Sequence, residues 1–321
     1  MLPHIHLFGM HIPMYSVMLA LGISLFLLLY FLSFRAEFHN DRVTFNRLTF
    51  CVLFSIAALG VFAFLFDSLF HSIEEGKLTA GGITWLGGVV GAFPTVLILT
   101  HRMVPKKRGY ELEVLDSLIP GLAVAHALGR VGCFLGGCCF GKVTDSPLGI
   151  SFPAGSTAAK LYPAGEGQGS LPVLPTQLFE AVFELIVFAA LVIISRKTKK
   201  YNTAIWSVSY SVFRFTLEFF RGDDRGSTAF SVSPAQLLSV LLFVFGVLLI
   251  LLRSGVALRS LAERLDEMKA ASDALPIVPY SSVLGKESNA EKLRELHSLM
   301  EEGLITEEEY ERKKAEILER M

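Results

Sequence analysis

Long runs of apolar residues, separated by short polar loops, fill most of this chain of 321 residues. Each run is about 20 residues long, the length that an α-helix needs to cross the hydrocarbon core of a membrane. The pattern predicts an all-α polytopic membrane protein with about seven spanning helices, at residues 14–34, 48–70, 83–99, 115–135, 178–195, 204–220 and 236–252. Pro94 and Pro120 interrupt the third and fourth runs, where protein or a cavity must satisfy the freed backbone groups.

Basic residues mark the loops that are expected to face the cytoplasm, because such loops carry an excess of Lys and Arg. They follow the first, third and fifth runs, within 35–47, 101–108 and 196–200. This pattern places the N-terminus and the long segment 142–177 outside, and the C-terminal tail in the cytoplasm. The first run is long enough to span and lacks a basic leader, so we expect no cleaved signal peptide.

Composition supports a membrane location. Hydrophobic residues make up 52% of the chain, and the mean hydropathy is +0.52, which is too apolar for an ordinary soluble domain. The formal net charge of −1 offers no overall attraction to nucleic acid. Charged residues are therefore informative only through their positions.

Residues beyond the last apolar run have a different pattern. We predict a membrane domain at 1–253, an amphipathic helix and linker at 254–289, and a cytoplasmic helical hairpin at 290–321. The amphipathic helix is indicated by apolar residues at helical spacing among charges, at Leu258, Leu261, Leu265 and Met268. The linker follows at 272–288, with two prolines.

Capping signals define the predicted hairpin. Gly303 suits the end of its first helix, and Thr306 with Glu309 forms a capping box for the second. The hairpin resembles the short C-terminal domain of many bacterial proteins, which implies self-association or a protein partner. A solvated hairpin without a specific partner is the alternative.

Two arginines lie within the apolar runs, where an unpaired charge is expensive and a functional role is expected. Arg130 lies at the outer end of the fourth run and Arg214 inside the sixth. Glu218 and Arg221 follow Arg214 by four and seven residues, so the three share a helical face. A guanidinium binds phosphate through two parallel hydrogen bonds, which favours a phospholipid headgroup as ligand. Structural pairing with carboxylates is the alternative.

The fifth run also carries polar side chains. Gln177, Glu180 and Glu184 face one side near its outer end. Buried carboxylates need partners, so we expect them to meet arginines, hydroxyls or water in a central cavity. A purely structural polar network is an equally good interpretation.

Glycines cluster around Arg130 in the segment 129–141. They indicate either close helix packing or a broken helix that lines a site, and their clustering favours the broken helix. His126 and Cys133 share the helical face of Arg130 by their spacing. A histidine at this position suits a general base near neutral pH, and a buried, hydrogen-bonded histidine is the alternative.

Three cysteines accompany these glycines, at Cys133, Cys138 and Cys139. Three interpretations remain open for them: small buried residues, a disulfide on the oxidising side of the membrane, or a thiol whose ionisation Arg130 favours. The spacing is not the Cys-x-x-Cys of zinc sites, and a metal site would need more ligands than the sequence shows. Cys51 is expected to be a core residue.

Four stretches resemble the prolipoprotein diacylglyceryl transferase family, in the same order along the chain. They are the glycine-rich segments 81–88 and 129–141, the segment 175–180 (Pro-Thr-Gln-Leu-Phe-Glu) and the segment 214–221 (Arg-Phe-x-x-Glu-Phe-Phe-Arg). Tyr15 also corresponds to a tyrosine at the start of the family's first helix. The resemblance covers about 12–252 and implies seven helices with the N-terminus outside.

The resemblance implies a bacterial inner-membrane enzyme that moves the diacylglyceryl group of phosphatidylglycerol to the lipobox cysteine of a preprolipoprotein and releases glycerol phosphate. Arg130 and Arg214 would hold the phosphate and stabilise it as it leaves, Glu218 would orient Arg214, and His126 is the candidate base. The substrate-binding residues that we expect are Tyr15, Gly87, Gly88, Cys133, Cys138, Gly141, Gln177, Glu180 and Arg221. No cofactor and no metal ion are expected.

The chain departs from the family's pattern at four positions. Asparagine is typical at the positions of Cys133 and Gly136, glutamate at Cys138, and histidine at Leu86. Either His126 serves as the base, or the acceptor thiol ionises without one, or the reaction has been lost or changed. The alternatives to a transferase are a phospholipid-binding or thiol-redox protein of the same fold, and a channel or transporter. The lack of an inverted repeat argues against the last class.

Overall fold

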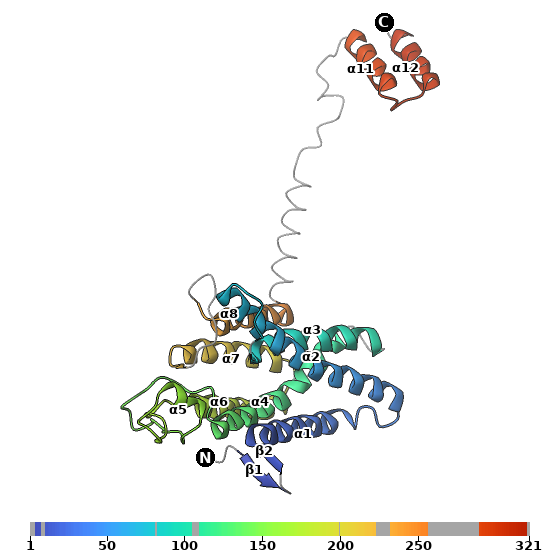
Figure 1. The fold of residues 1–321 in the computed structure, drawn as a ribbon. Helices are drawn as coiled ribbons and strands as arrows, with labels where there is room; N and C mark the ends of the chain where they lie inside the picture. The colour runs from blue at the N-terminus through green and yellow to red at the C-terminus, as the bar shows by residue number, and fades with distance from the viewer. Residues whose placement is uncertain are drawn as a thin grey trace. The chain divides into compact units, whose positions relative to one another are not determined.

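The computed structural model describes residues 4–7, 10–80, 82–104, 109–198, 200–222, 232–255 and 289–319. The chain divides into two compact units, Met1–Ala257 and Leu258–Met321, and we describe each by itself (Figure 1). The predicted amphipathic helix and linker at 254–289 fall almost entirely on residues 256–288, which lie outside the described residues, as do the basic residues 106–108.

The first unit is built from helices, with a two-stranded antiparallel sheet of β1 (His4–Leu7) and β2 (Met10–Pro13) before them. Its long helices in the described ranges are α1 (Met14–Phe34), α2 (Arg42–Glu75), α3 (Trp85–Met103), α4 (Tyr110–Gly136), α6 (Thr176–Ser195), α7 (Asn202–Glu218) and α8 (Pro234–Ser254). A short helix, α5 (Thr157–Leu161), lies in the long loop between α4 and α6.

Six helices of the described chain are long and apolar enough to cross a membrane: α1, α2, α3, α4, α6 and α8. The protein is therefore a polytopic, mostly α-helical membrane protein. The predicted sixth span folds as α7, but this helix has only 17 residues and buries polar side chains, among them Ser207, Ser211 and Arg214. A helix that faces protein on its polar side can carry these groups without exposing them to lipid.

The prolines and glycines do not break the helices as the sequence suggested. Pro94 lies inside α3 and Pro120 inside α4. Helix α4 also runs through Arg130 without a break and ends only at Gly136. Gly137 takes a left-handed conformation (φ 70°) and its N–H bonds the carbonyls of Cys133 and Phe134, which is the usual way for a helix to end at glycine.

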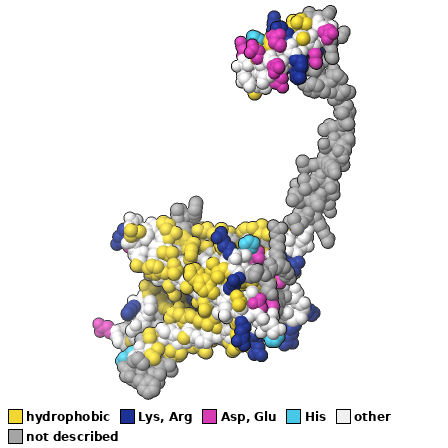
Figure 2. Space-filling model, turned by 90° about the vertical axis from the view of Figure 1, so that its right-hand side faces the viewer, with side chains coloured by type: hydrophobic (Ala, Val, Ile, Leu, Met, Phe, Trp, Pro, Cys, Tyr) yellow, Lys and Arg dark blue, Asp and Glu magenta, His cyan; other side chains and the backbone are white. Residues whose placement is uncertain are grey.

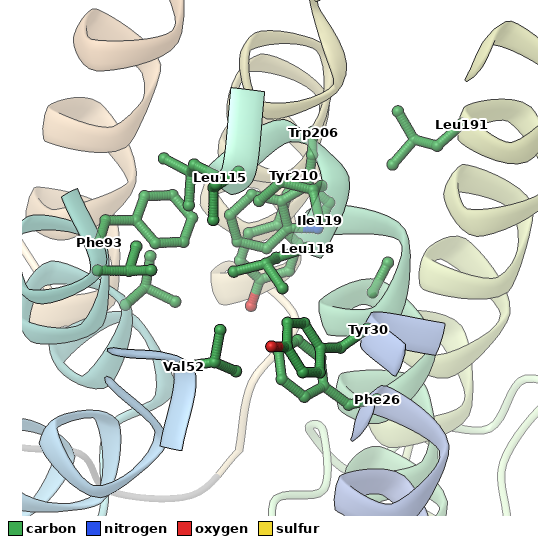
Figure 3. Close-up of a cluster of buried hydrophobic side chains, with 14 of the residues drawn as sticks. Phe26, Tyr30, Val52, Phe93, Leu115, Leu118, Ile119, Leu191, Trp206 and Tyr210 are labelled. Atoms are coloured by element: carbon green, nitrogen blue, oxygen red, sulfur yellow. The ribbon is translucent and has the colours of Figure 1, made fainter. Parts of the chain in front are cut away.

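Helix α4 is the centre of the unit. It packs against α1, α3, α6 and α7, while α2 packs against α3 and α7 against α8 (Figure 1). Figure 3 shows the apolar core between these helices, to which α1 contributes Tyr30, α3 contributes Phe93, α4 contributes Ile119, and α7 contributes Trp206 and Tyr210.

The outward faces of the helices are apolar. Exposed side chains include Phe54 on α2, Ile186 on α6 and Leu241 on α8, each more than half exposed. In the view of Figure 2, hydrophobic side chains cover a broad area of this unit, with charged side chains grouped beside it. Apolar residues that face outward on long helices are what contact with lipid acyl chains requires.

A buried carboxylate joins three elements at one end of the bundle. Asp116 on α4 is fully buried, accepts a hydrogen bond from the Thr203 backbone N–H at 2.8 Å, and pairs with Arg253 of α8. The Asn202 side chain donates to the Asp116 carbonyl at 3.0 Å. This network holds the start of α7 and the end of α8 against α4.

Replacing Asp116 with alanine is expected to lower the free energy of unfolding by about 3 kcal/mol, because Arg253 and the Thr203 N–H would lose a buried partner. Unfolding by heat or denaturant in detergent measures this change. Asp145, which is exposed, gives the matched control, and Asp145→Ala should be neutral. Equal stabilities of the two variants would contradict the structural role of Asp116.

The second unit contains α11 (Asn289–Glu301) and α12 (Glu307–Glu319), which pack together with Leu296 buried. The capping predictions are confirmed. Gly303 is left-handed (φ 72°), the Glu309 N–H donates to the Thr306 hydroxyl at 3.3 Å, and the Thr306 N–H donates to the Glu309 carboxylate at 3.2 Å.

Candidate functional site

A buried carboxylate on α2 fixes the loop that leads into α3. Asp67 accepts hydrogen bonds from the Gly82 N–H and the Thr84 hydroxyl, both at 2.5 Å. This anchor sets the first residue of α3, Trp85, against His126 of α4, with ring centroids 4.0 Å apart and the planes 9° from parallel.

Glu180 of α6 joins three helices within the bundle. Its Oε2 lies 2.8 Å from Nη2 of Arg130 on α4, and its Oε1 accepts a hydrogen bond from the Tyr210 hydroxyl of α7 at 2.8 Å. Only 1% of Glu180 is exposed. A carboxylate buried to this degree must be paired, and here the pairing fixes the direction of the Arg130 guanidinium.

A second carboxylate, one turn further along α6, holds His126. Nδ1 of His126 lies 2.9 Å from Oε1 of Glu184, and Trp206 of α7 donates its indole N–H to Oε2 at 3.1 Å. The other ring nitrogen of His126 lies 3.7 Å from Oε1 of Glu180. Both nitrogens thus face carboxylates, in an environment that is almost completely buried.

Arg214 has a carboxylate partner on its own helix. Its Nη1 lies 2.6 Å from Oε2 of Glu218, one turn later on α7, which is the pairing that the four-residue spacing predicted. Arg221 is buried beyond the end of α7, where its backbone forms an isolated antiparallel bridge with Gly141.

One cavity brings the two membrane arginines together. Its lining combines side chains of α3, α4, α6, α7 and α8: Thr84, Trp85, Leu86, Arg130, Glu180, Arg214, Pro234 and Ala235. Its volume is about 30 Å³, which is room for a water molecule or two. Two guanidinium groups thus line this cavity, and the indole N–H of Trp85, another lining residue, is buried without a hydrogen-bond partner among the described residues.

The segment after α4 is tied to the start of α6. Gln177 donates its side-chain N–H to the Cys138 carbonyl at 2.6 Å, and the Thr176 hydroxyl donates to the Cys139 carbonyl at 3.0 Å. The Gly141 N–H donates to the Leu174 carbonyl at 2.8 Å. A Cβ at Gly141 would lie 2.7 Å from the Phe220 carbonyl oxygen, so only glycine fits this crossing.

These bonds hold three thiols close together. The sulfur atoms of Cys133, Cys138 and Cys139 all lie within 4.8 Å of one another, and no disulfide joins them. A hydrogen bond with Cys133 lowers the pKa of the Cys138 thiol, but a hydrogen bond with Cys139 and burial raise it, to about 11. Cys51 is buried in the core on α2, as predicted.

Of the nine predicted substrate-binding residues, only Glu180 lines the cavity. Cys133, Cys138, Gly141 and Arg221 occupy the positions described above, and the remaining four support neighbouring helices and segments. Gly87 and Gly88 pack against α2, where added Cβ atoms would come within 2.5 Å of Phe66 and 2.8 Å of the Leu59 carbonyl oxygen. Tyr15 of α1 packs against Gly132 of α4, and Gln177 holds the cysteine segment. These four residues therefore support the helices and the cysteine segment around the cavity and do not line it.

Sequence reasoning missed Thr84 in the loop before α3, Trp85 at the start of α3, and Asp67 of α2, which holds that loop. It also missed Tyr210 and Trp206, although a signal was present. Both precede Arg214 at four-residue spacing and so share its helical face. Aromatic residues with a polar atom on the face of a buried arginine are candidates for its network.

Comparison with known proteins identifies the family of each part of the chain. A family model described as prolipoprotein diacylglyceryl transferase matches residues 3–252, and one described as a short C-terminal domain matches 291–318. A phosphatidylglycerol–prolipoprotein diacylglyceryl transferase 2 of Clostridium perfringens is 30% identical over 249 residues, 76% of this chain and 91% of the relative. The phosphatidylglycerol–prolipoprotein diacylglyceryl transferase of Clostridium tetani is 29% identical over 245 residues, 75% of this chain and 93% of the relative.

Proposed function

Because the chain belongs to the prolipoprotein diacylglyceryl transferase family, we propose that it transfers the diacylglyceryl group of phosphatidylglycerol to the lipobox cysteine of a preprolipoprotein. We place the reaction at the outer leaflet of the bacterial inner membrane, in line with the positions of the basic loops. In this reaction a carbon–sulfur bond forms, the carbon–oxygen bond to the phosphate breaks, and glycerol phosphate leaves with the electron pair.

The observation that carries this proposal is the convergence of Arg130 and Arg214, from two different helices, on one cavity. The leaving phosphate gains negative charge as the carbon–oxygen bond breaks. Two buried guanidinium groups stabilise that charge more in the transition state than in the bound lipid. Glu180 and Glu218 hold these groups in position.

The remaining predicted residues take supporting roles in the proposal. Arg221 and Gly141 join the segment after α7 to the cysteine segment, beside the site of the headgroup. Tyr15 and Gln177 support α4 and the cysteine segment, while Gly87 and Gly88 let α3 approach α2 closely enough to bring Trp85 to the cavity.

A transfer assay tests this function. The full-length protein in phosphatidylglycerol vesicles should raise the mass of a lipobox peptide by one diacylglyceryl group, and a peptide with serine in place of the cysteine should stay unmodified. Vesicles without phosphatidylglycerol should also give no product. Lipid binding without any product would instead favour the non-catalytic phospholipid-binding alternative.

His126 should act as a positioning residue. Its two nitrogens face Glu184 and Glu180, so neither is directed to an incoming thiol. His126→Gln keeps a donor and an acceptor, and we expect the transfer rate to stay within about tenfold of the parent. A loss of about 10²–10⁴-fold, the contribution typical of a general base, would assign the base to His126. The transfer rates of the parent and of His126→Gln are also measured over a range of pH values and compared.

A further inference from the structure

The three cysteines at the outer end of α4 form a preorganised cluster that the reaction described above does not use. Their sulfur atoms lie within 4.8 Å of one another. Cys139 has a left-handed backbone (φ 62°), uncommon for a residue with a side chain. Gln177 and Thr176 donate hydrogen bonds to the backbone carbonyls of Cys138 and Cys139. Such conformations persist where the surroundings impose them, and they cluster at binding sites.

We propose that Cys133, Cys138 and Cys139 bind one zinc ion as thiolates and that the acceptor thiol of the peptide occupies its fourth position. The zinc site itself is independent of the reaction, whereas the role of the fourth position rests on the proposed function.

The distances suit zinc. With zinc–sulfur bonds of about 2.3 Å, three thiolates of a tetrahedral site lie about 3.8 Å apart, so the sulfur atoms need to move by roughly 1 Å or less. Zinc sites that act in catalysis have three protein ligands and one open position. Cys133 is buried, but Cys138 and Cys139 are partly exposed, which leaves one side of the cluster accessible to a substrate.

The charges also suit zinc. Three thiolates and Zn²⁺ carry a net charge of −1, and a cation lies beside them: Nη1 of Arg130 is 4.0 Å from the Cys133 sulfur. The same guanidinium lines the cavity assigned to the phosphate. A sulfur bound at the fourth position would therefore lie close to the phosphate that leaves.

This site supplies a way to ionise the acceptor thiol that does not depend on His126, whose two nitrogens face Glu180 and Glu184. A thiol that coordinates zinc is deprotonated, and the thiolate is the nucleophile. The acceptor thiol releases its proton to water as it binds zinc. Its sulfur then donates an electron pair to the glyceryl carbon, and glycerol phosphate leaves with the electrons of the carbon–oxygen bond. Zinc keeps its charge throughout.

Metal content tests the site. Full-length protein purified in detergent should contain one zinc per chain by mass spectrometry, and the cobalt-substituted protein should show the intense sulfur-to-cobalt absorption of a tetrahedral thiolate site. Each of Cys133→Ser, Cys138→Ser and Cys139→Ser should weaken zinc binding more than about 100-fold, the upper range for losses at residues that only support metal ligands. The matched control is Cys51→Ser, which should retain the zinc. Zinc can also be removed from the unmutated protein with a chelator and then added back. Uptake of zinc by this protein tests the site without relying on the folding of the variants.

Adding a lipobox peptide to the cobalt protein tests the fourth position. The cobalt spectrum should change with the cysteine peptide and not with the serine peptide. Protein without zinc, or with two of these thiols oxidised to a disulfide, would overturn the proposal, and an unchanged spectrum would overturn the role of the fourth position. A changed spectrum without lipid transfer would support the zinc site and contradict the transferase function instead.

Discussion

Arg130→Ala should lower the rate of diacylglyceryl transfer by at least about 10²–10³-fold, the loss seen when one donor to a developing anion is removed. The reason is the position of this guanidinium, which lines the same cavity as Arg214. Arg130→Lys should give an intermediate rate, because lysine keeps the charge but not the planar fork. The transfer assay with labelled phosphatidylglycerol measures both variants.

Two comparisons make this prediction specific. Arg102→Ala removes an exposed arginine from the end of α3 and should leave the rate unchanged. If both membrane arginines hold one phosphate, the double variant Arg130→Ala/Arg214→Ala should lose less activity than the product of the two single losses. A rate for Arg130→Ala within threefold of the parent, in correctly folded protein, would contradict the mechanism.

Glu180→Ala should cause the largest loss of stability in the membrane unit, about 3–5 kcal/mol. The change leaves the Arg130 guanidinium buried without its carboxylate and removes the acceptor of the Tyr210 hydroxyl. Unfolding of the detergent-solubilised protein measures the effect. The exposed Glu166 of the long outer loop provides the control, and Glu166→Ala should unfold like the parent. Parent-like unfolding of Glu180→Ala would show that α4, α6 and α7 do not depend on this carboxylate.

The sequence predicted what depends on spacing along one helix. The shared face of His126, Arg130 and Cys133, the pair Arg214–Glu218 and the capping box at Thr306 all follow from helical periodicity. It did not predict that α4 continues through Arg130. Gly129, Gly132 and Gly136 fit a regular helix, and Gly137 is the first left-handed residue of the segment 129–141. Propensity alone does not decide which glycine ends a helix.

The sequence predicted that the buried carboxylates of α6 meet arginines or hydroxyls, as Glu180 does, but not which partner each carboxylate has. The meeting of Arg130 with Glu180, and of His126 with Glu184, depends on how α4 packs against α6. Trp85 contacts His126 because Asp67, which lies 18 residues earlier in the sequence, holds the loop that leads into α3. Such long-range choices are made by packing and burial of whole helices, and no local spacing encodes them.

Each of the two arginines in the cavity already has an acidic partner, Glu180 for Arg130 and Glu218 for Arg214. An incoming anion must therefore compete with two resident counter-ions that never leave the protein. These counter-ions weaken the hold on any phosphate, including the departing one, because the guanidinium groups can return to their carboxylates. Turnover benefits from this exchange, since a site with two unbalanced positive charges would retain its own product.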